Sequence, residues 1–254
     1  MTGGTGNATV RVNQGGNTNY SAAPELTANV TAFKNSSSTA LTSSTNPSSY
    51  NQSVTFTANV SGRPGTATGN VTFMEGSTVL AANVTMSGGK ATFTTSTFAV
   101  ASHAITAFYN GDANYNRSTS SALSQTVNKA GTTTSVRASP NQSTSGQVVT
   151  FTAVVTGAGA SGTVTFMDND IAMGTGTLSA GTATLNFSTL SVGNHSITAV
   201  YNGDSNFSSS TSEAIIQPVK AKTNWWLIGG LIAGGAVIII AMVITLVVVI
   251  RKHR

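Results

Sequence analysis

The segment VTFTANV at residues 54–60 alternates apolar and polar residues along its whole length. Valine, phenylalanine, alanine and valine occupy every second position, with threonine or asparagine between them. Because successive side chains of a strand point to opposite faces, this pattern predicts a β-strand with one buried and one exposed face. The pattern returns at residues 149–155 as VTFTAVV, so the chain predicts the same strand twice.

Two further segments recur at matching places downstream. GNVTFM at residues 69–74 becomes GTVTFM at 162–167, and HAITAFYNGD at 103–112 becomes HSITAVYNGD at 195–204. The spacing between matched segments shortens slightly along the chain, as small loop deletions would produce. Self-similarity at a fixed period predicts consecutive copies of one structural unit.

We place the two repeats at residues 35–129 and 130–219. Seven segments of the first repeat alternate in period two between turn residues, near residues 38–44, 53–61, 70–74, 78–86, 91–95, 103–109 and 122–127. Seven short antiparallel strands in a domain of this size suit an immunoglobulin-like β-sandwich. The predicted fold class is all-β, with tandem immunoglobulin-like β-sandwiches followed by a single transmembrane α-helix. Since the chain has no cysteine, apolar packing must hold each sandwich without disulfides.

Residues 1–34 look like the end of another repeat. VRVNQGGNTNYSAAPELTANV at residues 10–30 aligns with ITAFYNGDANYNRSTSSALSQTV at 105–127 when a two-residue gap is allowed. We interpret residues 1–34 as the C-terminal strands of a truncated upstream Ig-like repeat. Because two strands alone are marginally stable in water, we expect the natural protein to continue upstream with further repeats.

The repeated strands, with GGKATFTTSTFAVASHAITAFYNGDANY at 88–115 and AGTATLNFSTLSVGNHSITAVYNGDSNF at 180–207, resemble the Ig-like repeat domains of prokaryotic surface proteins, the bacterial Ig-like (Big) group. The resemblance covers about residues 36–219 and, more weakly, 8–34. It implies a β-sandwich module used in tandem as a stalk, spacer or adhesive element, generally without enzymatic activity. It implies no particular ligand, because one such scaffold hosts many functions.

The stretch at residues 225–250 contains no charged residue. About 20 apolar residues span the hydrocarbon core of a bilayer as a helix, so this stretch predicts a transmembrane helix. A juxtamembrane linker at residues 220–224 precedes it, and a basic cytoplasmic tail at 251–254 follows it. The residues expected at the membrane interface are Trp225, Trp226, Arg251, Lys252 and Arg254.

The whole net charge also belongs to these flanks. The formal net charge is +5, but residues 1–219 contain equal numbers of basic and acidic residues. The sequence therefore predicts membrane lipid as a partner and excludes nucleic acid, whose binding needs a basic surface. Gly230 and Gly234 form a GxxxG pair, on which two transmembrane helices can approach closely, and suggest lateral self-association.

Sequons for N-glycosylation are more frequent than chance would give in this composition. The predicted acceptors are Asn7, Asn19, Asn29, Asn35, Asn51, Asn59, Asn70, Asn83, Asn116, Asn141, Asn186, Asn194 and Asn206. They favour export, so we expect a single-pass protein of the cell membrane with its Ig-like domains extracellular and its C-terminus cytoplasmic. Residues 1–10 show no signal peptide. Either the chain is the C-terminal piece of a longer protein, which the partial repeat favours, or its helix is a tail anchor that leaves the domains in the cytoplasm.

The loop YNGD occurs in both repeats and has the residue types of a binding or catalytic loop. In the N-terminal fragment, however, Gly16 is kept while Asn17 replaces the aspartate. A metal ligand or catalytic acid would not survive that loss of charge, whereas a hairpin needs a glycine and a small hydrogen-bonding side chain. We therefore predict a structural hairpin and expect Asp112→Asn to leave the fold intact. The residues of the predicted hairpin are Tyr109, Gly111, Asp112, Tyr201, Gly203 and Asp204.

His103 and His195 also recur at equal places, with Asp112 and Asp204 near them along the chain. One histidine and one aspartate per repeat fall short of the three or four ligands of a metal site, so we predict structural roles for both histidines. MDND at residues 167–170 predicts a hairpin turn, since the later glycine and glutamate of a calcium loop are missing. The sequence thus predicts no catalytic, cofactor-binding or metal-binding residue.

These features predict a membrane-anchored cell-surface protein whose tandem Ig-like domains act as a glycosylatable stalk, spacer or adhesion module. The links at residues 127–134 and 218–224 are too short to act as long flexible coils. Two alternatives stay open: a surface domain that binds a polysaccharide or a protein, and a membrane tether for an enzyme domain lying upstream. Cell-surface glycans or other surface proteins are the partners that the adhesion and binding functions imply.

Overall fold

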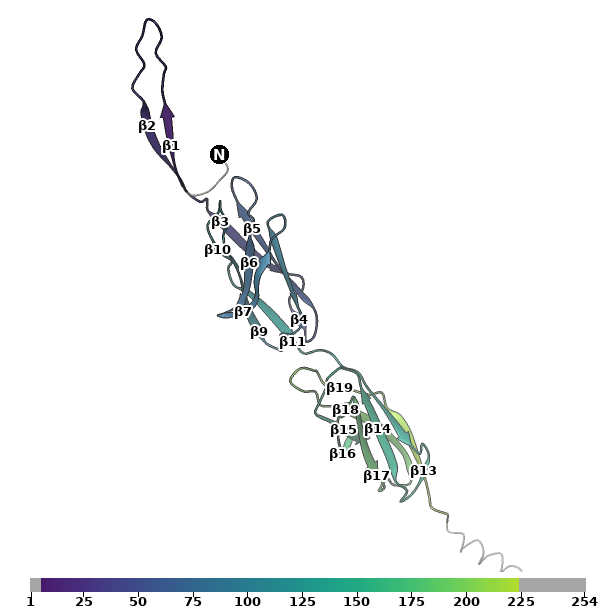
Figure 1. The fold of residues 1–254 in the computed structure, drawn as a ribbon. Helices are drawn as coiled ribbons and strands as arrows, with labels where there is room; N and C mark the ends of the chain where they lie inside the picture. The colour runs from purple at the N-terminus through teal and green to yellow at the C-terminus, as the bar shows by residue number, and fades with distance from the viewer. Residues whose placement is uncertain (1–5, 224–254) are drawn as a thin grey trace, which may run out of the picture. The chain divides into compact units, whose positions relative to one another are not determined.

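A computed structural model describes residues 6–223 of the chain, which form twenty β-strands (Figure 1). Residues 6–223 contain no helix with the length and hydrophobicity of a membrane span. The predicted transmembrane segment at 225–250, with its interfacial residues and its GxxxG pair, lies outside the described residues. The described residues divide into two compact units, 6–131 with 204–208 and 132–203 with 209–223.

The first sandwich packs a three-stranded sheet against a six-stranded sheet. The smaller sheet has the order β3 (Ser37–Ser43), β5 (Val54–Gly62) and β8 (Lys90–Thr95). The larger sheet has the order β4 (Ser48–Ser49), β11 (Leu123–Asn128), β9 (Ser102–Tyr109), β6 (Asn70–Glu75) and β7 (Thr78–Thr85), with β10 (Ser118–Thr119) paired to β9. All seven predicted strands are confirmed, and their bounds differ from the predicted ranges by at most one residue.

The second sandwich repeats this arrangement strand for strand. Its smaller sheet consists of β12 (Thr134–Ser139), β14 (Val149–Val155) and β17 (Thr182–Phe187). Its larger sheet consists of β13 (Ser143–Thr144), β20 (Ile215–Lys220), β18 (Gly193–Tyr201), β15 (Thr163–Asp168) and β16 (Ile171–Thr177), with β19 (Ser210–Thr211) paired to β18. The prediction of two tandem Ig-like sandwiches is therefore confirmed for the described residues.

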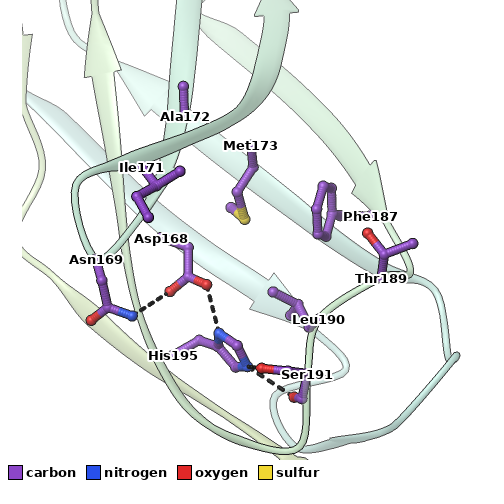
Figure 2. Close-up of a pocket in the computed structure, with 10 residues that line it drawn as sticks. All are labelled: Asp168, Asn169, Ile171, Ala172, Met173, Phe187, Thr189, Leu190, Ser191 and His195. Atoms are coloured by element: carbon purple, nitrogen blue, oxygen red, sulfur yellow. Dashed lines mark hydrogen bonds and ion pairs between the residues drawn. The ribbon is translucent and has the colours of Figure 1, made fainter.

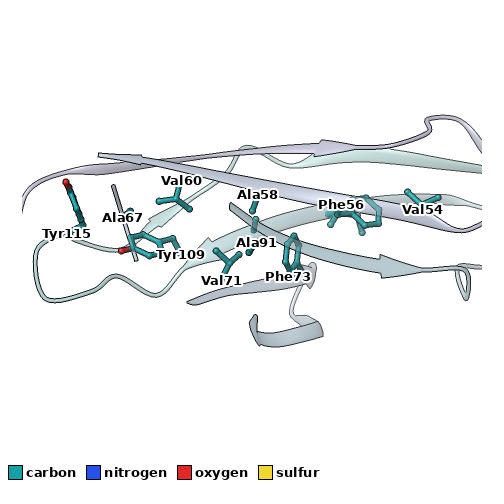
Figure 3. Close-up of a cluster of buried hydrophobic side chains, with 12 residues drawn as sticks. Val54, Phe56, Ala58, Val60, Ala67, Val71, Phe73, Ala91, Tyr109 and Tyr115 are labelled. Atoms are coloured by element: carbon teal, nitrogen blue, oxygen red, sulfur yellow. The ribbon is translucent and has the colours of Figure 1, made fainter. Parts of the chain in front are cut away.

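Each core lies between the two sheets and is built by the predicted alternation. Val54, Phe56 and Ala58 of β5 are at most 1% exposed, and Figure 3 shows them on the same face of their strand. Val71 and Phe73 of β6 meet them from the other sheet and are fully buried. The corresponding apolar positions of β14 are buried in the same way, because the two strands share one pattern.

Two short strands missed by the sequence pattern close one edge of each larger sheet. Ser48–Ser49 pairs in parallel with the end of β11 in the larger sheet, whereas the preceding strand β3 pairs with β5 in the smaller sheet. A fully buried glutamine holds this crossing: Gln125 Nε2 donates to the Thr45 carbonyl oxygen at 3.0 Å and to Ser48 Oγ at 3.2 Å. Gln217 and Ser143 repeat the side-chain contact in the second sandwich at 3.3 Å. Two-residue strands are too short to produce a periodic signal.

The N-terminal fragment forms the antiparallel pair β1 (Gly6–Val12) and β2 (Leu26–Ala32). Every residue of both strands is exposed. The expectation of two strands in residues 1–34 is thus confirmed. That they end an upstream sandwich stays a prediction.

We predict that Phe56→Ala destabilises the first sandwich by about 3–5 kcal/mol, because removal of a fully buried ring leaves a cavity between the sheets. Calorimetry of the chain should show part of the heat absorption moving to lower temperature while the part due to the second sandwich stays in place. Phe33→Ala is the matched control, since Phe33 is 81% exposed. An unchanged transition in Phe56→Ala would contradict the described core.

Candidate functional site

The repeated YNGD loop is closed by its aspartate. Asp112 Oδ1 accepts hydrogen bonds from the backbone amides of Asn114 at 2.8 Å and Tyr115 at 2.7 Å. Asp204 Oδ1 accepts the same two bonds in the second sandwich, both at 2.8 Å. In the N-terminal fragment Asn17 Oδ1 takes their place, with bonds of 2.9 and 3.0 Å. What all three copies keep is an acceptor oxygen, which an amide supplies as well as a carboxylate does.

The second carboxylate oxygen of Asp112 makes additional hydrogen bonds that bear on the expected effect of Asp112→Asn. Asp112 Oδ2 accepts hydrogen bonds from the backbone amide and the hydroxyl of Thr68, at 2.9 and 2.7 Å. Burial opposes ionisation, but these four donated bonds outweigh it and hold the pKa of Asp112 well below its ordinary value. An asparagine has only one acceptor oxygen. If that oxygen accepts from the loop amides, its NH₂ group faces the two donors of Thr68, which then lose their acceptor. The substitution is therefore compatible with the turn but not with all of its hydrogen bonds.

The glycine and the tyrosine of the loop have the predicted structural roles in both sandwiches. Gly111 and Gly203 have φ angles of 80° and 77°, which favour glycine. Tyr109 and Tyr201 are fully buried as the last core residues of their strands. In the N-terminal fragment Gly16 is not among the glycines with positive φ. A Cβ there would instead lie 2.6 Å from the backbone nitrogen of Ala22, so close packing is what requires this glycine.

The same loop also binds the chain that enters the sandwich. Lys34 Nζ donates to the Asp112 carbonyl oxygen at 2.6 Å, and the Asn35 amide donates to the Asn114 carbonyl oxygen at 2.8 Å.

Before the second sandwich, Lys129 Nζ donates to the Asp204 carbonyl oxygen. The Ala130 amide donates to the Asn206 carbonyl oxygen at 2.9 Å. The contact between a linker lysine and the YNGD loop is thus repeated, although the sequence did not reveal it.

Each recurring histidine is paired with an acid from the neighbouring strand. His103 Nδ1 lies 2.7 Å from Glu75 Oε1, and His195 Nδ1 lies 2.6 Å from Asp168 Oδ2. These partners are not the aspartates of the YNGD loops, which are nearer along the chain. Their signal in the sequence was an acid at the same place in both copies, in MEGS at 74–77 and MDND at 167–170.

The second ring nitrogen of His195 shows which form of the ring the site holds. Nε2 lies 2.9 Å from the Ser191 carbonyl oxygen, which can only accept, so Nε2 carries a hydrogen. Nδ1 faces a carboxylate and also donates, which makes the ring an imidazolium. Burial of the ring acts against its charge, but the bonds to Ser191 and Asp168 outweigh burial and raise the pKa of His195 above its ordinary value.

A pocket of about 330 Å³ opens beside this ion pair in the second sandwich. Figure 2 shows the side chains of Met173, Phe187 and Leu190 around it, with Asp168 hydrogen-bonded to both His195 and Asn169. The turn that carries Asn169 and Asp170 has φ angles of 48° and 64°, as a two-residue hairpin requires. The prediction of a hairpin turn at MDND is therefore confirmed. In residues 6–223 no three His, Asp or Glu side chains converge as a metal site would require.

All thirteen predicted glycosylation acceptors lie at the surface at least in part. Asn59, Asn70 and Asn206 are half-buried, and the other ten are exposed. Asn186, which alternates with more buried positions of β17, lies on the exposed face of its strand. The structure therefore leaves these asparagines accessible, while their modification remains a prediction.

Comparison with known proteins finds one family and several similar structures. The model of the bacterial Ig-like domain (group 3) matches residues 41–128 and 136–220. Fibronectin(III)-like modules of Clostridium thermocellum CbhA are 17% identical over 71% of this chain and 94% of that chain, with a TM-score of 0.34. The Yersinia pseudotuberculosis adhesin InvE is 14% identical over 70% of this chain and 58% of that chain, with a TM-score of 0.32. No curated protein matches the chain.

We predict that Asp112→Asn keeps the sandwich folded but destabilises it by about 1–3 kcal/mol, because a donor of Thr68 loses its acceptor. Calorimetry of Asp112→Asn, Thr68→Val and the double variant forms a double-mutant cycle. The two single effects should not add fully, since both variants disturb the bond between the Thr68 hydroxyl and Asp112, while the backbone amide of residue 68 is kept in Thr68→Val. Full additivity would show that Asp112 and Thr68 act independently.

The His195 pair predicts that the second sandwich loses stability as pH rises. Because its folded pKa is raised, the stabilisation is fully present below the unfolded pKa, about 6.5, and disappears as pH passes through the folded pKa. The melting temperature should therefore fall as pH rises above about 6.5, and His195→Gln should reduce this dependence. Equal pH dependence in both proteins would contradict the assigned imidazolium.

Proposed function

Because the chain belongs to the bacterial Ig-like domain (group 3) family, we propose that it is a cell-surface protein whose sandwiches form a membrane-anchored, glycosylated stalk or adhesion module. In this proposal the domains lie outside the cell, the segment at 225–250 crosses the membrane and the tail at 251–254 is cytoplasmic. The proposed role is mechanical and non-enzymatic.

The attachment of each entering segment to its own sandwich carries this proposal. Strand β11 ends at Asn128, and Ala130 already forms a β-bridge with Phe207. Only Lys129 lies between them, and its ammonium group is bound to the loop as well. A stalk needs links with few free residues, because each free residue adds freedom between successive domains.

The surface composition also supports an external position. Only 7% of the chain is charged, and hydroxyl and amide side chains supply much of its polarity. Cross-strand hydroxyl contacts such as Thr55 to Thr94, at 2.8 Å, cover the outer face of the smaller sheet. Such a neutral, hydrophilic face, with accessible sequons, suits a layer of glycans outside the cell.

Protease treatment of intact cells tests the proposal. An epitope placed at Gly146, where a side chain would meet nothing within 4 Å, should be removed from intact cells, while a tag after Arg254 should survive. Mass spectrometry of the released fragments should find glycans at exposed acceptors such as Asn186.

Lysed cells are the control, because both tags should then be cleaved. Protection of the Gly146 epitope in intact cells, with cleavage only after lysis, would overturn the external location. Unmodified asparagine at all thirteen acceptors would remove glycosylation from the proposal and leave the stalk.

A further inference from the structure

The two sandwiches differ beside their histidines, although the contacts between histidine and acid have similar geometry. In the first sandwich the ring of Phe98 packs against the His103 ring, with centroids 4.5 Å apart and planes inclined by 30°. The same phenylalanine makes an edge contact with Phe56 in the core, at 5.9 Å. An aromatic ring of the domain itself therefore covers this imidazole.

Leucine stands at the equivalent place of the second sandwich. Leu190 precedes His195 by five residues, as Phe98 precedes His103. Leu190 is 7% exposed and lines the pocket of about 330 Å³, together with Met173, Phe187 and His195. The smaller side chain thus coincides with an open pocket beside the imidazole, and ligand pockets of proteins begin at about this volume.

The walls of this pocket suit one kind of ligand group. Met173, Phe187 and Leu190 offer apolar and aromatic contacts, as Figure 2 shows. His195 has both ring nitrogens engaged, by Asp168 and by the Ser191 carbonyl oxygen, so its plane is held in position. The free direction of an imidazole held in this way is its face, and a positively charged ring attracts the face of another aromatic ring.

We propose that the pocket beside His195 binds a planar aromatic ring of a ligand, in a contact like that of the Phe98 ring with His103 in the first sandwich. The ring enters between Leu190, Phe187 and Met173 and stacks on the imidazole. We place the site in the second sandwich because in the first the Phe98 ring already stacks on the equivalent imidazole. The inference rests on the difference between the repeats and is independent of where the protein lies in the cell.

Methyl NMR of the full chain in nanodiscs, titrated with indole, tests this site. Indole should shift the methyl signals of Ile171 and Met173, which line the pocket, with a dissociation constant on the order of 1 mM for so small a ligand. The variant Leu190→Phe should weaken these shifts at least about tenfold, because it introduces the ring found in the first sandwich. Ala40, an exposed residue of β3, provides a methyl signal that should not move.

The reciprocal variant keeps the test decisive if Leu190→Phe fails to fold. Phe98→Leu should open the first sandwich in the same way and give new indole shifts at Leu80, a partly buried residue packed against the first core. Absence of shifts at Ile171 and Met173 in the natural chain would overturn the proposal. So would equal shifts in a folded Leu190→Phe variant, or no new shift in Phe98→Leu when Leu190→Phe is unfolded.

Discussion

Apolar contact between two facing sheets is the constraint on which both sandwiches depend, since the chain has no cysteine with which to connect them. Phe56 and Phe73 come from opposite sheets of the first core, and Phe151 and Phe166 occupy the same positions in the second, with ring centroids 6.4 Å apart. A fully buried aromatic side chain removes a large apolar area from water, so a few such residues can dominate the stability of a small domain.

Polar side chains then close the places that apolar packing leaves open. The aspartate of the YNGD loop binds the loop amides, and the buried glutamine binds a serine of the short parallel strand. The histidine at the beginning of the central strand binds an acid of its neighbour. Because these contacts occur in both copies, they belong to the architecture of the domain. Where the copies diverge, as at Phe98 and Leu190, the difference points to a property of one domain.

The loop that first suggested chemistry has two structural tasks. It follows the central strand of the larger sheet and turns the chain back. Its carbonyl oxygens accept hydrogen bonds from the linker lysine and from the backbone amide of the next residue. Binding of the entering segments leaves fewer free residues in each link. A stalk with such links is stiffer than one with free linkers. The family, the polar surface and the bound linkers thus support the same mechanical role, to which the pocket beside His195 would add recognition.

The strands, their buried faces and the duplication follow from local patterns in the sequence. Alternation is a local property, so VTFTANV specified which side chains of β5 are buried, and the change from Asp112 to Asn17 among the copies already indicated a structural turn. The contacts between distant residues, in contrast, become visible only once the chain is folded. Glu75 and His103 are 28 residues apart, and Thr68 and Asp112 are 44 apart. Their contacts depend on the order of strands in the sheet and on how the loops return at each end, which no local pattern encodes. The pocket beside Leu190 could not be predicted from the sequence for the same reason. Its basis is the difference from Phe98, whose ring packs on the equivalent histidine of the first sandwich, and that contact is seen only in the folded domain.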